Sequence, residues 1–351
     1  MQPARFSRKA ISKSILAIIV VVIIVVAASA GYFLTIKSST SSPVIVYSAD
    51  AYVAETSALA SGFTNQTGIK TTPPKGGGSL TLAQQIAQGN PVSVFVSVSK
   101  SAVSPAYLKN TSSGWAIAFA GDQMTIAYSN TTAKNSAVEK VISSFQTAET
   151  TNTTHAWFDF YSNLTSGAVK VGISNPNADP AGFRGWLVLE AAGFAYAGNE
   201  SYFTGRMLEK NANTTGASAA DLIAPLQAGQ IQFLFIYRSA AVAQRLNYLQ
   251  LPPAVNLGSP SYSKYYSQFT YKISTGVQIA SPIILFVTVP SDATNPAAAL
   301  EFTSYVVEHS SSLSSYGLTS FSRAVLYNDT SVPQAIQKLI SQGSVVLGGS
   351  L

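Results

Sequence analysis

The sequence contains no cysteine and only two histidines among its 351 residues. Without cysteine the chain can form no disulfide, no thiolate metal site and no cysteine nucleophile, so packing and hydrogen bonding must stabilise it. His155 and His309 lie beside Thr154 and Glu308, and neither histidine begins a metal-binding or catalytic-triad spacing. We therefore expect a protein that is not an enzyme.

Charge is also scarce, because Asp, Glu, Lys and Arg together make up only 10% of the residues. The net charge is +6, but five of the 21 basic residues lie in residues 1–37, which contain no acid. The remainder carries 16 basic and 15 acidic residues and is close to neutral. It has no basic run interleaved with aromatics, so binding to nucleic acid is not expected.

The N-terminal segment has the pattern of a membrane anchor. Arg5, Arg8, Lys9 and Lys13 precede an apolar stretch over Ile15–Leu34, about the length needed to cross ~30 Å of hydrocarbon. The positive flank is expected in the cytoplasm and the rest of the chain outside the cell, tethered to the cell membrane.

Two interpretations of this segment remain open, and both give the same topology. Lys9-Ala10-Ile11-Ser12 resembles the processing site of archaeal type IV pilin-like signals, where cleavage would leave the apolar helix attached. The alternative is a plain uncleaved anchor, since a secretory signal usually has a shorter apolar core.

Glycosylation acceptors agree with an extracellular location. Asn-x-Ser/Thr sequons mark surface loops of secreted proteins. The chain contains eight, at Asn65, Asn110, Asn130, Asn152, Asn163, Asn199, Asn213 and Asn328. We expect glycans to contribute to the hydration of a surface that is poor in charge.

From Val44 onward, short β-branched runs alternate with helical patterns, which predicts an α/β fold with a largely parallel sheet. Predicted strands are 44–47, 69–72, 92–98, 124–128, 171–174, 233–236, 248–251 and 279–289. Predicted helices are 54–68, 79–89, 136–146, 158–164, 183–195, 221–228, 240–246, 297–310 and 332–341.

The order of these elements predicts two α/β lobes joined by two crossover strands, because the chain leaves the first lobe and later returns to it. The expected organisation is a basic segment at 1–14, an anchor at 15–37, a linker at 38–43, lobe 1 at 44–123 plus 274–351, and lobe 2 at 124–273. In such folds ligands bind beyond the carboxyl ends of the strands, where helices begin.

Two helix starts are candidate binding elements. Gly76-Gly77-Gly78-Ser79 opens a helix, where backbone N–H groups, the helix dipole and a hydroxyl can hold an oxyanion, although a Gly-rich loop with a Ser cap is also common. Asp179-Pro180-Ala181 opens another, where Asp179 can be an N-cap with proline at the first position and no ligand.

The end of the strand before Tyr237 is a third candidate. The Tyr237 hydroxyl is expected to face the mouth of a cleft as a neutral donor. The alternative is that the Tyr237 side chain only packs at the rim. Arg184 and Arg238 follow these motifs and can either attract anions or form structural salt bridges.

Four blocks of sequence resemble the archaeal tungstate/molybdate-binding proteins of ABC transporters. They are PPKGGGSLTLAQQIAQGNPVSVFVSV (73–98), WAIAFAGDQMTIAYS (115–129), SNPNADPAGFRGWLVLEAAG (174–193), and FIYRSAAVAQ with the following LPPAVNLG (235–258). The likeness covers roughly Val44–Ile340. It implies a type II periplasmic-binding-protein fold, with tungstate or molybdate as ligand, no cofactor, and an ABC permease and ATPase as partners.

The resemblance also implies ligand contacts. Ser79, the backbone of Ala181 and Tyr237 would donate to the oxyanion, and the carboxylate of Asp179 would approach its metal. The family usually has Cys where this chain has Ala181. This change matters little if only the backbone is used.

Two departures affect the predicted site. The family has Ala-Gly-Ser where this chain has Ala49-Asp50-Ala51, so Asp50 must point away, be protonated, or coordinate the ligand's metal. Ser48 is a candidate replacement for the missing hydroxyl. The family also places a Glu before the helix leading to Tyr237, and the nearest acid here is Asp221.

These patterns predict a solute-binding protein that clamps a tungstate- or molybdate-type oxyanion between two lobes and delivers it to a permease. The alternatives are a binding protein for another small solute, or a pilin-like subunit of a surface structure.

Overall fold

The computed structural model describes residues 42–351, which form one compact unit, Ser42–Leu351. The predicted basic segment (1–14) and anchor (15–37), and most of the linker (38–43), lie outside the described residues. Within the described range, no helix is both long and apolar enough to cross a membrane.

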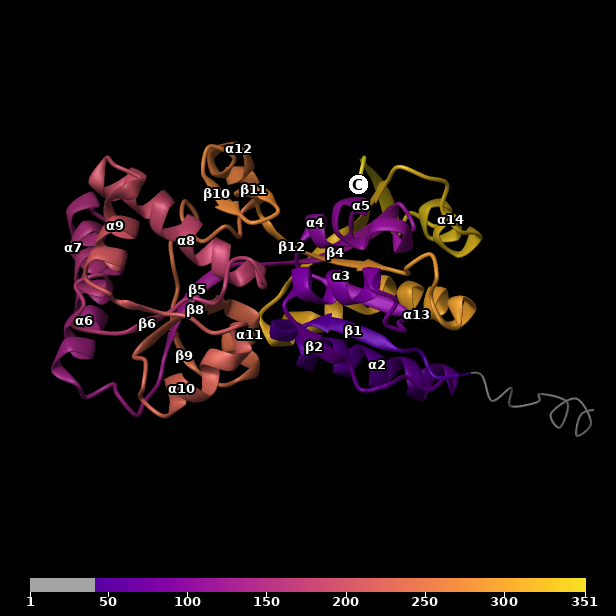
Figure 1. The fold of residues 1–351 in the computed structure, drawn as a ribbon, viewed down its shortest axis with the longest axis horizontal. Coiled ribbons are helices and arrows are strands. Elements are labelled where there is room, and N and C mark those ends of the chain that lie inside the picture. The colour runs from indigo at the N-terminus through magenta and orange to yellow at the C-terminus, as the bar shows by residue number, and fades with distance from the viewer. Residues whose placement is uncertain (1–41) are drawn as a thin grey trace, which may run out of the picture. The chain divides into compact units, whose positions relative to one another are not determined.

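Two main sheets organise this unit (Figure 1). The larger has seven strands in the order β14-β13-β4-β12-β3-β1-β2. Its members are β1 (Val46–Ala49), β2 (Lys75–Gly77), β3 (Val94–Ser97), β4 (Trp115–Asp122), β12 (Ile283–Thr288), β13 (Thr319–Asn328) and β14 (Val345–Gly349).

The second sheet has five strands in the order β7-β6-β8-β5-β9. Its members are β5 (Met124–Tyr128), β6 (Val171–Gly172), β7 (Asn213–Thr214), β8 (Phe233–Tyr237) and β9 (Asn247–Leu249). A separate hairpin of β10 (Thr270–Ile273) and β11 (Gly276–Ile279) precedes the return of the chain to the larger sheet. We call the parts around the larger and smaller sheets lobe 1 and lobe 2.

Helices pack around both sheets. Those of lobe 1 are η1 (Asp50–Tyr52), α2 (Val53–Thr67), α3 (Ser79–Ala87), α4 (Lys100–Val103), α5 (Pro105–Leu108), η2 (Lys109–Thr111), α13 (Pro296–His309), η6 (Ser310–Tyr316) and α14 (Gln334–Ser341). Those of lobe 2 are α6 (Ser136–Thr151), α7 (Thr154–Leu164), α8 (Pro180–Ala192), the π-helical turn η3 (Gly193–Ala197), α9 (Ser201–Glu209), η4 (Ala220–Leu222), α10 (Ile223–Gln227), α11 (Arg238–Ala243), η5 (Pro260–Tyr262) and α12 (Ser263–Tyr266).

Both sheets are mixed, which corrects the predicted largely parallel arrangement. β1 pairs in parallel with β2 and β3, but β12 runs antiparallel to β3 and to β4. β5 is likewise antiparallel to β8 and β9. The reason is connectivity: the returning segment enters the larger sheet from lobe 2 rather than through a helical crossover, so its direction is reversed.

Two predicted strands are displaced. Residues 69–72 make only an isolated bridge between Val44 and Thr71, and the neighbour of β1 is the glycine-containing β2. The predicted strand 279–289 starts only at Ile283, because the residues before it belong to the hairpin and to the segment joining the lobes.

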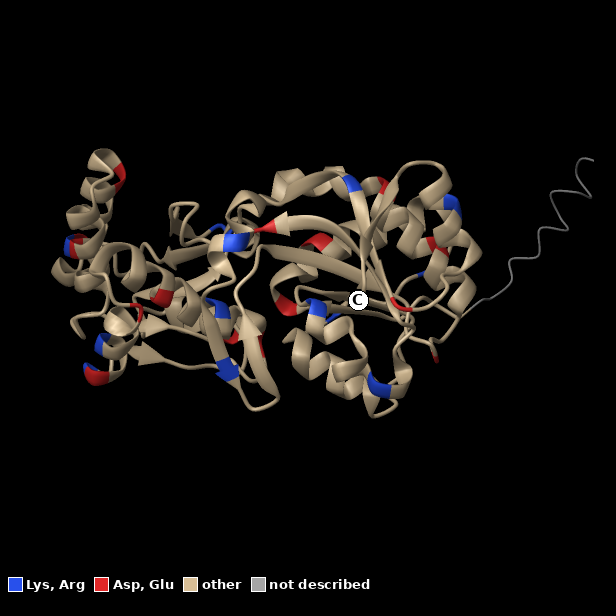
Figure 2. Cartoon of the chain, turned by 90° about the horizontal axis from the view of Figure 1, so that it is seen from above, with Lys and Arg blue, Asp and Glu red and all other residues tan. Residues whose placement is uncertain are grey.

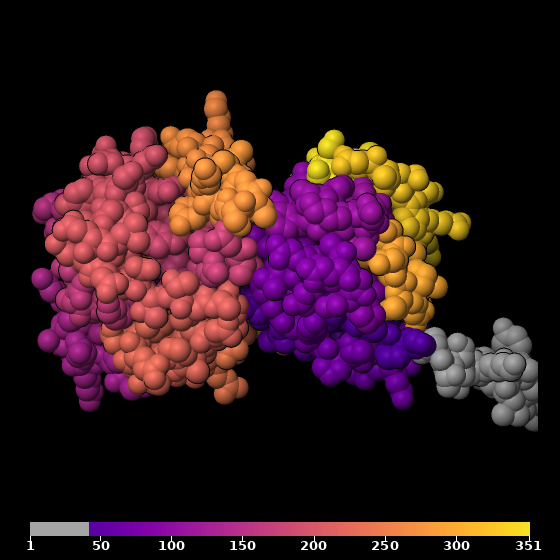
Figure 3. Space-filling view, in the orientation of Figure 1, coloured from indigo at the N-terminus to yellow at the C-terminus, as the bar shows by residue number. Residues whose placement is uncertain are grey.

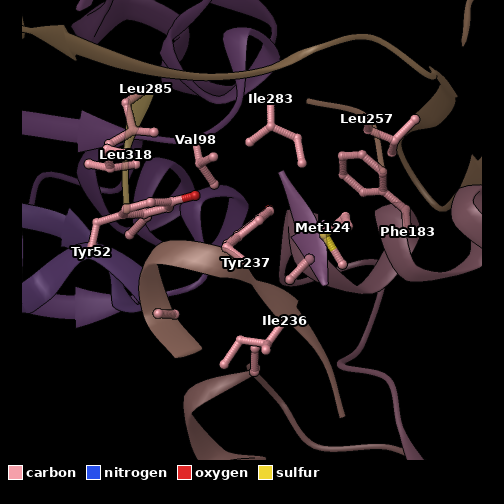
Figure 4. Packing of buried hydrophobic residues seen from close by; sticks show 14 of the residues in the cluster. Tyr52, Val98, Met124, Phe183, Ile236, Tyr237, Leu257, Ile283, Leu285 and Leu318 are labelled. Carbon is pink, nitrogen blue, oxygen red and sulfur yellow. The ribbon is translucent and has the colours of Figure 1, made fainter. Parts of the chain in front are cut away.

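The chain passes between the sheets at Gln123, the single residue between β4 and β5. Backbone hydrogen bonds hold the chain at this junction: the Gln123 carbonyl accepts from the Arg238 amide at 2.9 Å, and the Met124 amide donates to the Asn256 carbonyl at 2.7 Å. Met124 and Tyr237 lie in the buried cluster drawn in Figure 4, with Tyr52 from lobe 1 packed on Tyr237.

Candidate functional site

A cleft of about 510 Å³ is lined by both lobes. Lobe 1 contributes η1, the glycine segment of β2 and the first turn of α3. Lobe 2 contributes the segment before α8 and the loop leading into η4. The lining residues are Asp50, Val53, Gly76, Gly77, Gly78, Thr81, Ala178, Ala217, Ser218, Ala220 and Asp221.

The lobes touch beside this cleft (Figure 3). A Cβ placed on Gly78 would lie 2.2 Å from the carbonyl oxygen of Ala178, so only glycine permits this approach. The Thr81 hydroxyl donates to the same carbonyl at 3.4 Å. Because α3 and α8 begin on either side of this contact, the two candidate helix starts face one another across the lobes.

Asp179 caps α8 from a fully buried position. Its Oδ1 accepts from the Ala181 amide at 3.0 Å, and its Oδ2 accepts from the Ala219 amide at 2.8 Å. Burial and the neighbouring Asp50 carboxylate raise the pKa of Asp179 from 3.8 to about 7. Pro180 fills the first helical position, where no amide is needed. The predicted capping geometry is therefore present, and the Ala181 amide is already used by it.

Asp50 is among the residues that line the cleft. Its Oδ1 accepts from the Ala51 amide at 2.8 Å, whereas its Oδ2 is buried without a hydrogen-bond partner among the described residues. Burial raises the pKa of Asp50, and the Asp221 carboxylate adds to the shift. A buried carboxylate oxygen without a donor is costly, which favours a protonated group or a ligand.

Asp221 lies in the same cleft from the opposite lobe. It is exposed, and its Oδ2 accepts from the amide of Ser218 at 2.9 Å and from the hydroxyl at 3.0 Å. The structure thus brings Asp50 and Asp221 into one cleft, with Asp179 close enough to sense the charge of Asp50. No lysine or arginine lines this cleft.

The serines occupy buried positions behind the cleft lining. Ser79 is fully buried, and its hydroxyl oxygen accepts from the Val98 amide at 3.2 Å. Because the Ser79 oxygen is the acceptor in that bond, the hydroxyl proton of Ser79 remains available for donation to a ligand. Ser48 donates to the Ala49 carbonyl and pairs with the Thr56 hydroxyl at 2.9 Å. Ser48 is therefore committed to local structure and does not replace the family's serine in the cleft lining.

Tyr237 does not face the cleft mouth as the sequence predicted. It is fully buried, its ring lies 5.4 Å from that of Tyr52, and its hydroxyl accepts from Arg184 at 2.8 Å. Burial raises the pKa of Tyr237, so the phenol stays protonated. The strand continues one residue further than predicted and then turns directly into α11, which buries the ring between the lobes.

Of the two alternatives for Arg184 and Arg238, structural salt bridges are not seen in the described residues, where the ion pairs are His155 with Asp159 and Lys210 with Glu209. The Arg238 guanidinium instead donates to the Gly317 carbonyl, with its Nε at 3.0 Å. Figure 2 shows that the Lys, Arg, Asp and Glu residues are sparse and scattered along the described chain.

Buried carboxyls outside the predicted set form a second group. Asp122, at the end of β4, accepts from the Tyr52 hydroxyl at 2.9 Å and from the Ser239 hydroxyl, and burial raises its pKa to about 6. Glu55 is buried with neither oxygen hydrogen-bonded in residues 42–351, and burial raises its pKa to about 7. Little in the sequence singles out Glu55. It lies in the first turn of a predicted helix, where acidic residues are favourable and usually exposed.

Comparison with known proteins identifies the family. The model for bacterial extracellular solute-binding proteins matches residues 44–318. The chain belongs to this family. Its members are transport proteins rather than catalysts, in agreement with the expectation that the chain is not an enzyme.

Two archaeal relatives have similar sequences over most of their length. A solute-binding protein of Sulfurisphaera tokodaii is 38% identical over 329 residues, covering 90% of this chain and 85% of the relative. One from Saccharolobus solfataricus is also 38% identical, over 321 residues, covering 89% and 79%.

Solved structures support the fold. The periplasmic molybdate-binding protein of Azotobacter vinelandii superposes with a TM-score of 0.55 at 16% identity, covering 79% of this chain and 98% of that one. The sulfate-binding protein SubI of Mycobacterium tuberculosis gives 0.53 at 13% identity, covering 88% and 94%. At these identities the likeness establishes a periplasmic-binding-protein fold and nothing about the ligand.

Proposed function

We propose that this solute-binding protein captures a tungstate- or molybdate-type oxyanion outside the cell and delivers it to an ABC permease with its ATPase. The observation that supports this choice is the meeting of Asp50 and Asp221 in one interlobe cleft, beside the buried Asp179. The membrane anchor predicted for residues 15–37 would hold the body close to the permease.

Carboxylates distinguish this ligand class from simpler oxyanions. Ionised carboxylates repel sulfate and phosphate, whose central atoms do not take up further oxygen ligands. Molybdenum(VI) and tungsten(VI) accept additional oxygens, and carboxylates are suitable oxygen donors. Asp179 is buried beside this cleft and accepts one amide hydrogen bond on each carboxylate oxygen, which leaves each oxygen a further lone pair for a ligand when the group is ionised.

A second candidate is a neutral solute rich in hydroxyls. Carboxylate oxygens without donors, such as Oδ2 of Asp50, accept hydrogen bonds from sugar hydroxyls without electrostatic repulsion. The cleft of about 510 Å³ has room for such a molecule.

Binding is tested by thermal unfolding and calorimetry of the full chain with tungstate, molybdate, sulfate, phosphate and a panel of sugars. Tungstate or molybdate at 100 times its Kd is expected to stabilise the protein by about 2.7 kcal/mol, seen as a rise in Tm. Asp179→Asn should abolish the rise. The control Asp292→Asn alters an exposed loop aspartate and should retain it. Binding of sulfate, phosphate or a sugar in place of both metal oxyanions would reject the proposed ligand while leaving a transport role intact.

A further inference from the structure

A second cavity, of about 250 Å³, lies under the β10–β11 hairpin. Its walls come from the turn after β3, the second turn of α8 and strand β11. The hairpin and α12 are the orange elements beside α8 in Figure 1. This cavity and the aspartate cleft share no lining residue.

Arg184 supplies the charge of this cavity. Only 6% of its surface is exposed, and its one side-chain hydrogen bond within residues 42–351 goes to the Tyr237 hydroxyl. The guanidinium carbon lies 5.6 Å from the Phe183 ring centroid and 5.7 Å from that of Tyr237. No carboxylate of the described chain lies within 4 Å of it. A buried guanidinium without a counter-charge is energetically costly, so the site is suited to an anion.

The neighbouring polar groups add neutral donors but no second positive charge. Ser99 is buried, and its amide and carbonyl are bound to Ser97, but its hydroxyl has no partner in the described chain. Gln278 adds a half-buried amide. The Lys100 ammonium points elsewhere, since it donates to the Ser350 carbonyl at 2.7 Å and lies over the Tyr327 ring. One guanidinium therefore sets the charge, which favours a singly charged anion.

The rest of the lining is apolar. Phe183 and Leu187 form the buried wall, and Val277 and Ile279 stand at the rim with 59% and 60% of their surfaces exposed. An inorganic oxyanion would leave these side chains without contacts, whereas a short aliphatic chain would cover them. At about 250 Å³ the cavity is smaller than the usual pocket for a drug-sized ligand.

We propose that this cavity is a binding site for a small aliphatic monocarboxylate, held by the Arg184 guanidinium and the Ser99 hydroxyl, with its chain against Leu187 and Ile279. The Arg184 bond to Tyr237 places this site next to a tyrosine that packs against Tyr52 of lobe 1. The site stands on its own residues and does not depend on the identity of the oxyanion.

The test measures binding of butyrate to the full chain by calorimetry and ligand-observed NMR. Uncharged butyramide is the matched control. Butyrate is expected to bind, and butyramide to bind roughly tenfold or more weakly, because it lacks the charge-assisted hydrogen bond. Arg184→Met should reduce butyrate affinity by a similar factor. Arg238→Met, which removes a guanidinium bound to the Gly317 carbonyl, should leave it unchanged.

A cavity-filling variant guards against loss of binding through misfolding of Arg184→Met. Gln278→Trp changes a half-buried residue of the hairpin and should block butyrate while Tm and tungstate binding persist. Equal binding of butyrate and butyramide, retention in Arg184→Met, or competitive displacement of butyrate by tungstate would each overturn the proposal. Butyrate binding without any tungstate binding would reject only the proposed transport ligand.

Discussion

At the scale of single residues, Asp50 is the main departure from the resembled sequences, because Ala49-Asp50-Ala51 stands where they have Ala-Gly-Ser. Asp50 has one oxygen bound to the Ala51 amide and the other buried without a partner, and it raises the pKa of Asp179. The two carboxyls are therefore coupled, and an anion bound beside an ionised Asp50 would favour protonation of Asp179. Proton uptake on binding is the expected consequence.

Replacing Asp50 tests this coupling. Asp50→Ser and the nearly isosteric Asp50→Asn both remove the carboxylate, and each should weaken tungstate binding on the order of tenfold at about pH 8, because the proposed oxygen donor to the metal is lost. Because a protonated Asp50 is a poorer donor to the metal, the loss should shrink at about pH 5. Calorimetry at the two pH values measures both effects. Stronger binding in both variants would show that the Asp50 carboxylate repels the anion and does not bind its metal.

At the scale of elements, sequence periodicity predicted helices better than sheet partners. Gly68 ends α2 in the left-handed conformation and Asp179-Pro180 begins α8, both as predicted, because caps are local signals. β2 was missed because Lys75–Gly77 has no strand pattern and is held by its pairing with β1. β13 and β14 were missed for the same reason, since β-structure depends on neighbours that local sequence does not specify.

The candidate site was predicted in part for similar reasons. Helix-start residues and the acids could be found from sequence, because their spacing from glycine and proline is local. The hydrogen bonds of Ser48 with Thr56 and of Tyr237 with Arg184 could not be predicted, because each joins a strand to a helix through tertiary packing. The second cavity depends on the β10–β11 hairpin, for which no strands were predicted apart from Ile279 at the start of the predicted strand 279–289.

Contact between the starts of α3 and α8 gives a prediction at this scale. Gly78→Ala places a methyl group 2.2 Å from the Ala178 carbonyl oxygen, so the lobes should be held apart. We expect tungstate affinity to fall roughly tenfold or more, since closure contacts are lost, and the radius of gyration in small-angle scattering to rise. Gly205→Ala is the matched control, because it lies within α9 with no heavy atom near its added Cβ and should bind normally. Normal affinity and an unchanged radius in Gly78→Ala would show that this contact does not limit closure.

At the scale of the whole molecule, buried carboxyls outnumber buried positive charges that could pair with them. Glu55, Asp122 and Asp179 are all buried, and burial raises the pKa of each, to about 7, about 6 and about 7. Arg184 is the buried cation among the described residues, and it binds a phenol rather than a carboxylate. The folded state therefore keeps these acids protonated under mildly acidic conditions, in which the unfolded chain would have released the protons.

The sign of the pH dependence follows from these shifts. Between the ordinary values, 3.8 for Asp and 4.5 for Glu, and the raised values of about 6 to 7, the folded protein binds more protons than the unfolded chain. Stability is then fully present below the ordinary pKa values and is lost as pH rises through the folded ones. Urea unfolding should give a free energy of unfolding that is greater by a few kcal/mol at about pH 4 than at about pH 8.

The substitution Glu55→Gln tests the contribution of one of these carboxyls. It should remove roughly 1 to 3 kcal/mol of that difference, because the Glu55 carboxyl has no hydrogen-bond partner in the described chain. Exposed Glu308→Gln should leave the difference intact. A free energy of unfolding that is the same at both pH values, or greater at about pH 8, would contradict the prediction. It would mean that these carboxyls are ionised in the folded protein.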